Sequence, residues 1–356
     1  MNQSGDLSHA YDAKRDCRIP SGFPGHRVHC PLGQAGVSPF TRRHIQMKLE
    51  ENGYSYKEYI VPGSDMPPSQ QPGWLKKQIR LLKFFHSSLL TDKNDGFVDA
   101  IIDAVGAYAR AAGYAILFSS VSQEDYSDVL AQLRSDTCDG LLVLATEMSR
   151  EEIMQLVALP MPVVILDSDH PGLPFSCVTM DNRDIAYQAM MHLISLGTRD
   201  IGYLRSTIRT GNFVSRENGY IEALRAEHIA PDPALIFNLT PSLTGAYQDM
   251  AACLREGQRV PRALFADNDI LAIGAMRALC ERGLRVPEDV YIIGVDNTLL
   301  SQVSSPTLSN MQISRSSLGQ MAISTLLRQI DAPGSERFHL RVCGHLMIRS
   351  STGGEG

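Results

Sequence analysis

Two apolar runs in the second half of the chain end in carboxylate and amide side chains. Asn268 and Asp269 follow the run 263–266, and Asp296 directly follows the run 291–295. Asp296 would end a buried strand, where a carboxylate needs partners, and sugar hydroxyls are suitable donors. An amide can both donate to a hydroxyl and accept from one. We therefore predict that Asn268 and Asp296 bind a hydroxyl-rich ligand, with helix capping as the alternative for Asp296. Asp269 is interpreted as the N-cap of the following helix.

Three further side chains are candidates for the same chemistry. Arg216 stands at the predicted start of a helix, where a cation is unfavourable, so another interaction is expected to hold it. Asp167 closes the run 162–166, and its carboxylate either accepts ligand hydroxyls or lies in a solvated turn. Phe97 is the first apolar residue of a predicted helix and is either a stacking surface for a ligand or part of the core. His86 lies on a polar loop and is interpreted as a surface residue.

The two runs that carry Asn268 and Asp296 are joined by a helical segment, 270–281. Strand, helix and strand within a short stretch predict a βαβ unit with parallel strands and a right-handed crossover. Open parallel sheets bind ligands at the carboxyl ends of their strands. The predicted ligand residues stand at those ends.

Apolar runs alternate with helical segments along most of the chain, which predicts doubly wound parallel sheets and an α/β fold. A first set of elements combines expected strands 78–85, 114–119, 140–145 and 162–167 with helices 97–112, 126–135 and 150–158. A second set combines expected helices 181–196, 216–228 and 247–255 with strands 201–205 and 234–237, and leads into the βαβ unit. Two such sets predict two lobes with a cleft between them.

Three short motifs give this chain a resemblance to a known family. They are Asn268-Asp269, the run Gly294-Val295-Asp296-Asn297, and Arg216-Glu217-Asn218-Gly219-Tyr220. In this order they resemble the marks of the LacI/GalR family of ligand-responsive transcription regulators, and the resemblance runs over residues 37–56 and 76–352. It implies a two-lobed body with the periplasmic-binding-protein fold.

The resemblance also implies a division into domains. Residues 76–180 and 310–330 are expected to form the N-terminal lobe, and residues 181–309 and 331–352 the C-terminal lobe. In relatives the residue matching Arg216 forks onto sugar or carboxylate oxygens, and an aromatic at the place of Phe97 commonly stacks on the ligand. The expected partners are a small effector, most of all a carbohydrate, operator DNA and a second copy of the chain. The expected function is that of a ligand-responsive transcription regulator, a repressor in the first place, with an activator as the open alternative.

Residues 1–56 are expected to form a small, atypical α-helical headpiece. A helix opens near Ser38-Pro39, and Gly53 ends it. It resembles the third helix of the family's DNA-binding headpiece, and Thr41 and Arg42 are its candidate DNA-binding residues. The stretch 13–34 has three prolines and no helical period, so it does not predict the helix-turn-helix expected before it.

Two explanations remain open for that stretch. Codons for residues 22–29 can be chosen so that a shift of one base reads Val-Ser-Arg-Ala-Thr-Val-Ser, which resembles a family recognition helix. Either the gene carries a frameshift, or this N-terminus is genuinely divergent. The following segment, 57–75, contains four prolines and predicts an extended linker. These prolines disfavour the short hinge helix that many relatives insert into the minor groove.

Composition narrows the possible classes of protein. The chain has 356 residues, 44% of them hydrophobic, which is enough for two or three domains. The net charge is −6, yet the first 60 residues carry eight Lys or Arg against six Asp or Glu. Such a basic head suits phosphate contact, although random scatter explains an imbalance this small equally well.

Several functions are not supported by any pattern in the chain. No dinucleotide-binding, Walker, nucleophile-elbow or zinc-protease motif is present, so we expect no enzyme and no cofactor. The seven cysteines form no CxxC pair, which favours reduced thiols over a disulfide frame or a metal site. Without a hydrophobic N-terminal segment or a membrane span, a cytoplasmic location is expected. The alternative to a regulator is a sugar- or solute-binding protein that does not bind DNA because its headpiece is defective.

Overall fold

The computed structural model describes residues 77–86 and 96–354. The predicted headpiece (1–56) and linker (57–75), and with them Thr41 and Arg42, lie outside the described residues. Within the described ranges, no helix is both long enough and apolar enough to cross a membrane.

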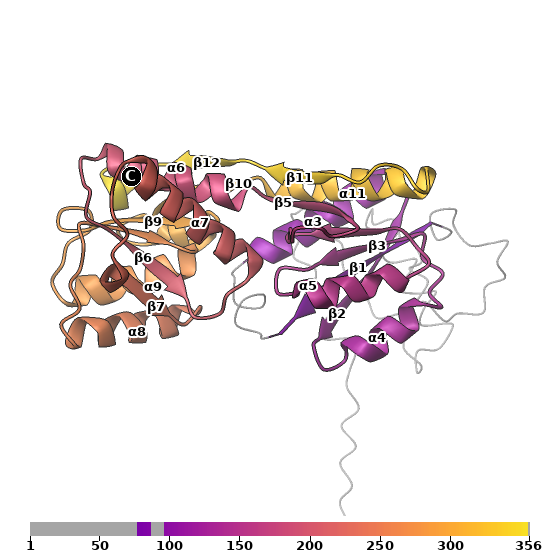
Figure 1. Ribbon diagram of the computed structural model, residues 1–356, viewed down its shortest axis with the longest axis horizontal. Coiled ribbons are helices and arrows are strands. Elements are labelled where there is room, and N and C mark those ends of the chain that lie inside the picture. The colour runs from indigo at the N-terminus through magenta and orange to yellow at the C-terminus, as the bar shows by residue number, and fades with distance from the viewer. Residues whose placement is uncertain (1–76, 87–95, 355–356) are drawn as a thin grey trace, which may run out of the picture. The chain divides into compact units, whose positions relative to one another are not determined.

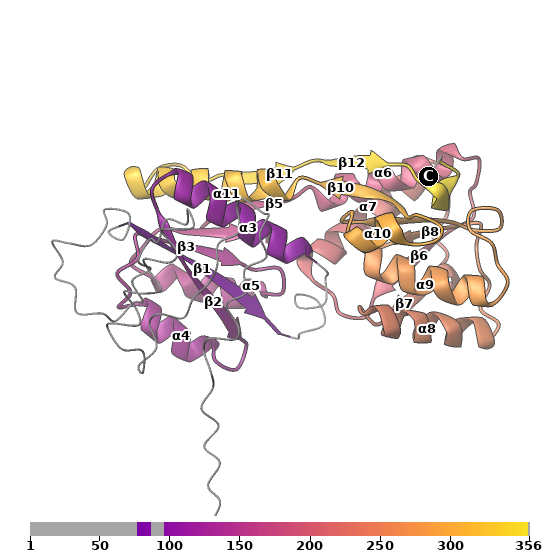
Figure 2. The ribbon, with the colours of Figure 1, turned by 180° about the vertical axis from the view of Figure 1, so that it is seen from behind.

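The first of two sheets has six parallel strands in the order β11-β5-β4-β3-β1-β2 (Figure 1). Its strands are β1 (Gln78–Phe85), β2 (Ala115–Ser122), β3 (Gly140–Leu144), β4 (Val163–Leu166), β5 (Ser176–Met180) and β11 (His339–Val342). Four helices and one 3-10 turn pack with it: α3 (Phe97–Ala111), α4 (Tyr126–Leu133), α5 (Arg150–Gln155), α11 (Arg315–Asp331) and η3 (Leu156–Ala158). We call this assembly lobe 1. In Figure 2, α3 and α11 lie together along its sheet.

The second sheet has the order β12-β10-β9-β8-β6-β7, and of these strands β12 alone is antiparallel to its neighbour. Its strands are β6 (Ile201–Ser206), β7 (Ile236–Leu239), β8 (Ala263–Ala266), β9 (Tyr291–Val295), β10 (Ser309–Ile313) and β12 (Gly344–Met347). With it pack α6 (Asn182–Ser195), α7 (Gly211–Ala226), α8 (Leu243–Arg255), α9 (Asp269–Glu281), α10 (Leu299–Val303), η4 (Pro233–Leu235) and η5 (Ser350–Thr352). We call this assembly lobe 2.

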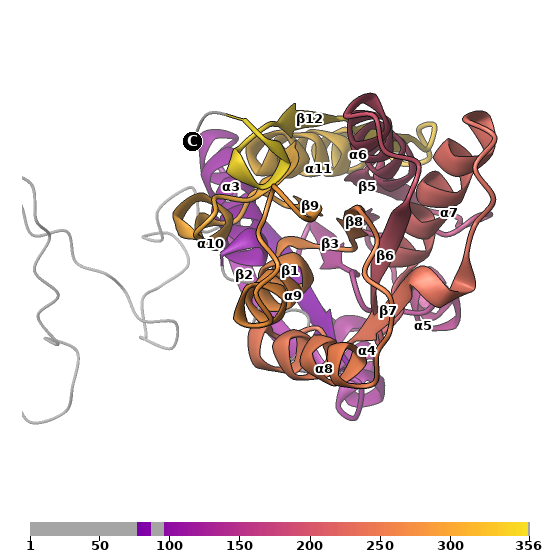
Figure 3. The same cartoon turned by 90° about the vertical axis from the view of Figure 1, so that its left-hand side faces the viewer.

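Helices cover both faces of each sheet, as the alternation of apolar runs and helical segments predicts. In lobe 2, α6 and α7 pack on one face, and α8 and α9 on the other (Figure 3). Neighbouring residues of one strand serve opposite faces: Tyr203 points to the α6 and α7 side and Leu204 to the α8 and α9 side. Strands buried on both sides are apolar at every position, which explains why β8 and β9 could be located from sequence.

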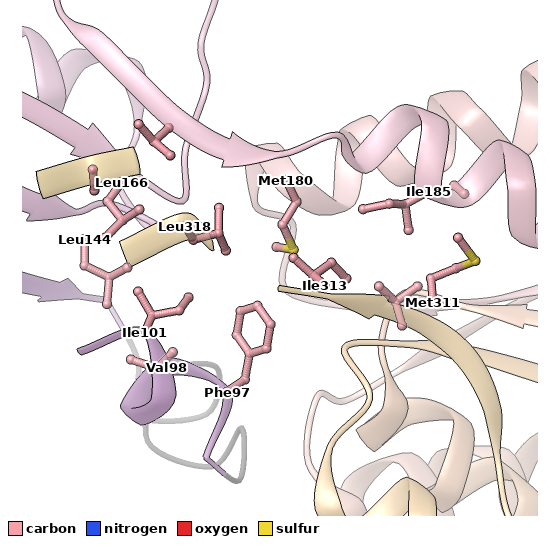
Figure 4. Packing of buried hydrophobic residues seen from close by; sticks show 14 of the residues in the cluster. Phe97, Val98, Ile101, Leu144, Leu166, Met180, Ile185, Met311, Ile313 and Leu318 are labelled. Carbon is pink, nitrogen blue, oxygen red and sulfur yellow. The ribbon is translucent and has the colours of Figure 1, made fainter. Parts of the chain in front are cut away.

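The chain passes between the lobes three times, after β5, after β10 and between β11 and β12. Apolar residues beside the first two passages belong to one continuous core, which contains residues of both lobes. Met180 and Ile185 flank the first passage, and Met311 and Ile313 precede the second. In Figure 4, Met180 and Ile313 lie between the lobe 1 side chains and the pair Ile185 and Met311 of lobe 2. The passages therefore run through packed core and not over a bare surface.

The α/β class and the two-lobed body of doubly wound sheets are confirmed, but four expectations about elements were wrong. β10 belongs to the second sheet although residues 310–330 were assigned to the N-terminal lobe, and β11 belongs to the first sheet although residues 331–352 were assigned to the other. Strand β5 was not expected, because its Ser, Cys and Thr residues interrupt the apolar run by which a fully buried strand is recognised. Helix α7 begins at Gly211, five residues before its expected start. Strand pairing depends on partners far along the chain, which an apolar run does not reveal.

Candidate functional site

One small cavity collects side chains from both lobes at the carboxyl ends of the two sheets. It is lined by Phe97, Val98, Thr146, Asp167, Met180, Thr210, Asn212, Phe213, Arg216, Asn268 and Asp296. All five residues predicted to bind a ligand are in this set. Its volume of about 30 Å³ is the space of roughly one water molecule. A larger ligand must therefore move the lobes or the side chains apart.

A larger cavity, of about 580 Å³, lies elsewhere in lobe 1, beside the amino ends of β4 and β5. Prolines and residues of the turn after α11 form most of its wall. The carboxyl ends of the strands are where parallel sheets bind ligands, and the small cavity also gathers convergent polar groups. We therefore take the small cavity as the candidate functional site.

Arg216 is the centre of the lobe 2 side of the cavity and is 2% exposed. Its Nε donates to Asn182 Oδ1 at 2.9 Å, and its Nη1 donates to the backbone oxygen of Asp267. Its Nη2 lies 3.3 Å from Asp296 Oδ1. Because Thr210 caps α7, Arg216 stands in the second turn of the helix and not at its start. The prediction that Arg216 stands at the start of its helix was therefore wrong. The three contacts explain how the buried guanidinium is held.

Asp296 follows β9 in a left-handed backbone conformation, with φ 109°, and Asn297 continues it with φ 52°. Such conformations are costly for residues with side chains and are found where a site requires them. Arg315, at the start of α11, donates to the backbone oxygens of both residues. The turn thus aims the Asp296 carboxylate at Arg216 and is held by the helix that enters lobe 1.

Gly294 leaves room for a buried carboxylate beneath this turn, where a larger residue would collide with it. A Cβ at Gly294 would lie 2.5 Å from Asp269 Oδ1. The other oxygen, Asp269 Oδ2, accepts from the backbone N–H and the hydroxyl of Thr298 at 2.8 and 3.0 Å. Burial and the neighbouring Asp296 raise the pKa of Asp269 to about 7. The Gly-x-Asp-Asn motif and Asp269 therefore form one packed unit.

Asn268, not Asp269, is the N-cap of α9. Its Oδ1 accepts from the backbone N–H of Leu271 at 3.1 Å. The interpretation of Asp269 as the cap was wrong, since α9 begins one residue earlier than expected. With its oxygen engaged in capping, Asn268 would meet a ligand through its amide N–H group. Its place in the cavity wall agrees with the prediction of a ligand residue but does not test it.

Asp167 provides the lobe 1 carboxylate. It is 1% exposed and also left-handed, with φ 60°. Thr146 donates to its Oδ2 at 2.7 Å, and Asn212 of lobe 2 donates to its Oδ1 at 3.1 Å. Burial raises the pKa of Asp167 to about 6, although the hydrogen bond from Thr146 and the charge of Arg216 oppose the shift. The alternative of a solvated turn is excluded by this burial.

Phe97 is a core residue, which was one of the two interpretations of its position in the sequence. It is 3% exposed and belongs to the continuous core, yet its ring also lines the cavity (Figure 4). The guanidinium of Arg315 lies 5.1 Å from the ring centroid. Its core position is shown, and stacking on a ligand stays a prediction.

Sequence reasoning missed several residues of the wall, among them Thr146, Asn212 and Phe213. Asn212 joins the lobes, because it donates to Asp167 and its Oδ1 accepts from Asn182 at 3.0 Å. Thr146 comes two residues after β3, so the rule about strand ends would have found it. Asn212 and Phe213 lie in the first turn of α7, which the sequence presented as a loop.

The wall of the cavity offers both hydrogen-bond donors and hydrogen-bond acceptors to a ligand. Arg216 and the amides donate, while the carboxylates of Asp167 and Asp296 accept, which matches the mixed donor and acceptor character of hydroxyl groups. Asp267, completely buried below Arg216, accepts from Tyr203, from the Ser206 N–H at 2.8 Å and from Arg209 at 2.6 Å. Burial raises the pKa of Asp267, against the opposing charge of Arg209. His86 contacts Glu152 at 3.0 Å, away from the cavity.

Comparison with known proteins agrees with this fold. The profile of the periplasmic binding protein-like domain matches residues 190–352. The HTH-type transcriptional repressor PurR of Aliivibrio salmonicida is 30% identical over 270 residues, 74% of this chain and 80% of that protein. PurR of Histophilus somni is 29% identical over 326 residues, 89% of this chain and 96% of that protein.

Solved structures give the same result. A LacI family transcriptional regulator from Enterococcus faecium, with bound ribose, has a TM-score of 0.66 and 26% identity, and the match covers 78% of this chain and 98% of that one. The transcriptional regulator CelR in complex with cellobiose has a TM-score of 0.70 at 24% identity over 90% of this chain and 93% of that one, which shows the shared fold. From its motifs, its two-lobed fold and these relatives, the chain belongs to the LacI/GalR family of ligand-responsive transcriptional regulators.

Proposed function

We propose that this regulator is a repressor that senses a carbohydrate in the cavity between its lobes and binds operator DNA through its N-terminal headpiece. The observation that carries the effector site is the convergence of Arg216, Asp296 and Asn268 from lobe 2 with Asp167 and Phe97 from lobe 1. Four polar side chains around an aromatic ring suit the hydroxyls and the apolar face of a sugar. The ribose bound to the Enterococcus faecium relative supports this effector class.

The contacts that now close the cavity suggest how an effector acts. The Arg216–Asp296 pair and the Asn212–Asp167 hydrogen bond occupy groups that a sugar would use. An effector that replaces these contacts changes the relative stability of the open and closed arrangements of the lobes. It then shifts the population between states that bind DNA and states that do not.

The effector proposal is tested by calorimetry on the full chain with a panel of pentoses, hexoses and disaccharides, and with nucleobases as planar competitors. We expect one carbohydrate to bind, and Arg216→Met to abolish that binding. Arg225→Met is the matched control, because Arg225 is exposed on the same helix. Binding of a nucleobase and of no sugar would contradict the carbohydrate assignment while leaving the site in place.

The DNA-binding part of the proposal is tested by gel shift with the DNA upstream of the gene, across a range of salt concentrations. The chain as written is compared with a version whose reading frame is restored over residues 22–29. Specific binding by the restored form alone supports a frameshift, and binding by the chain as written supports a divergent headpiece. If neither form binds but a sugar does, the protein is a solute-binding protein without operator recognition.

We also propose that the regulator is a homodimer. Leu299 and Val303 are 70% and 68% exposed and stand one turn apart on α10. Exposed apolar pairs of this kind support an interface between copies, and dimers match palindromic operators. Sedimentation of the wild type and of Leu299→Glu tests this, with a dimer expected for the first and a monomer for the second.

A further inference from the structure

Outside the effector cavity, a carboxylate, a thiol and an imidazole meet at one edge of lobe 1. One ligand atom each from Asp169, Cys177 and His339 lies within 4.8 Å of the other two. Asp169 Oδ1 and His339 Nδ1 are 2.9 Å apart, and Cys177 Sγ lies 3.8 Å from the backbone oxygen of Phe175. Among the described residues this is the one group of three potential metal ligands.

The fold brings these residues together through strand register. His339 of β11 and Cys177 of β5 are direct partners in a parallel pair, so their side chains leave the sheet on the same face. Asp169 lies in the loop after β4, the next strand of the sheet. The Cys177 side chain is on the face of the first sheet that α4 and α5 cover. His339 is on the edge strand and is exposed, Asp169 is partly exposed, and the Cys177 thiol is buried beneath them.

We propose that Asp169, Cys177 and His339 form a site for one divalent transition-metal ion of the zinc class. A thiolate, an imidazole and a carboxylate are the three ligand types that zinc prefers, and three protein ligands leave the fourth position for water. In a tetrahedral zinc site the donor atoms stand roughly 3.3–3.8 Å apart. For a metal to bind, Asp169 Oδ1 and His339 Nδ1, now 2.9 Å apart, would have to separate to that spacing.

Arg341 is the competitor for this site. Its Nη2 and Nε donate to Asp169 Oδ2 at 2.8 and 3.1 Å. The Arg341 side chain is 56% exposed, so it can turn into solvent when a metal takes its place. The Arg341–Asp169 pair thus neutralises the carboxylate in the absence of metal.

The sequence could not indicate this site. Zinc motifs are recognised by ligands a few residues apart, whereas His339 is more than 160 positions from Cys177 and reaches it only because the chain returns to lobe 1 as β11. For the same reason, a metal at this point would join the last strand of the sheet to β5 and to the loop after β4.

The test uses the full chain under reducing conditions, with zinc and with cobalt as a spectroscopic probe. We expect the wild type to show thiolate-to-cobalt charge-transfer absorption, and zinc to raise its melting temperature, since a ligand of the folded state stabilises it. Cys177→Ser and His339→Asn should each remove the contribution of this site, with affinity there reduced at least about 100-fold. The double variant Cys280→Ser, His345→Asn is the matched control, because both residues are exposed and lie outside the group.

Arg341→Met provides a result of opposite sign. Removing the competing cation should tighten zinc binding about tenfold, if the metal replaces the guanidinium on Asp169. The proposal is overturned if the zinc stoichiometry and the cobalt spectrum are the same in the wild type, in Cys177→Ser and in His339→Asn. Any zinc that binds elsewhere in the chain remains in all of these proteins and does not affect the comparison.

Discussion

The two walls of the effector cavity are built in different ways. On the lobe 2 side, Arg216 is held by Asn182 and Asp267, and the Asp296 turn rests on the Gly294–Asp269 unit. These contacts lie within lobe 2 or beside its first helix. On the lobe 1 side, the carboxylate of Asp167 depends on Thr146 from its own lobe and on Asn212 from the other. Lobe 2 therefore presents a preorganised surface, and the lobe 1 surface is completed only when the lobes meet.

Among the variants that test this difference between the walls, Arg216→Met is expected to have the largest effect on stability. It leaves Asp296 buried without its guanidinium and removes a donor to the Asp267 carbonyl. Breaking a buried pair by removing one partner costs about 3–5 kcal/mol. Urea unfolding should show a loss of that size, and Arg225→Met should show almost none. A stability equal to the wild type would mean that lobe 2 is not organised around this residue.

The pH dependence of stability distinguishes Asp167, in the cavity wall, from Asp269, which lies beneath the Asp296 turn. Asp167 has a pKa raised from 3.8 to about 6, so the folded state binds its proton more tightly than the unfolded state does. The contribution of Asp167 to stability should therefore fall as pH rises from about 4 to 6, by roughly 2–3 kcal/mol, and stay level above that range.

Asp167→Asn should remove this part of the slope. In this variant, Asp269, whose pKa is raised to about 7, should still make the free energy of unfolding decline as the pH rises to about 7. The measurement is the free energy of unfolding in urea at a series of pH values. Parallel curves for the variant and the wild type would show that Asp167 does not titrate in this range.

Gly294→Ala tests the packed unit of lobe 2. The added Cβ would lie 2.5 Å from Asp269 Oδ1 and 3.0 Å from Leu308 Cδ2, so the buried carboxylate must shift. Overpacking of this kind costs about 1–3 kcal/mol. Gly106→Ala is the matched control, since nothing lies within 4 Å of a Cβ there. Equal melting temperatures for the two variants would contradict the account of the motif.

Asn212→Ala should have the smallest effect on stability, about 1 kcal/mol, because the hydrogen bonds it removes join the lobes and do not build either one. Its main consequence should be a shift toward an open arrangement. Small-angle scattering should therefore report a larger radius of gyration for the variant. An unchanged scattering curve would mean that Asn212 does not hold the lobes together.

The sequence predicted some residues of the cavity wall for the right reason, some for a wrong reason, and others not at all. Asp296 and Asp167 were found because each directly follows a buried apolar strand, and Asn268 because it comes two residues after one. Arg216 was predicted for a partly wrong reason, since its helix begins at Gly211. Asn212 was missed for that same reason. Its role depends on the distance to Asp167, which no local pattern contains.

The sequence by itself determined most of the alternation of strands and helices, the family motifs and five of the eleven residues that line the cavity. These features are local, because burial on both faces of a sheet and helix capping leave patterns within a few residues. Only the tertiary structure decided that β10 and β11 exchange lobes, that Asn212 reaches Asp167, and that His339 meets Cys177. Each of these depends on pairing between distant segments, and that pairing is set by the packing of the whole core.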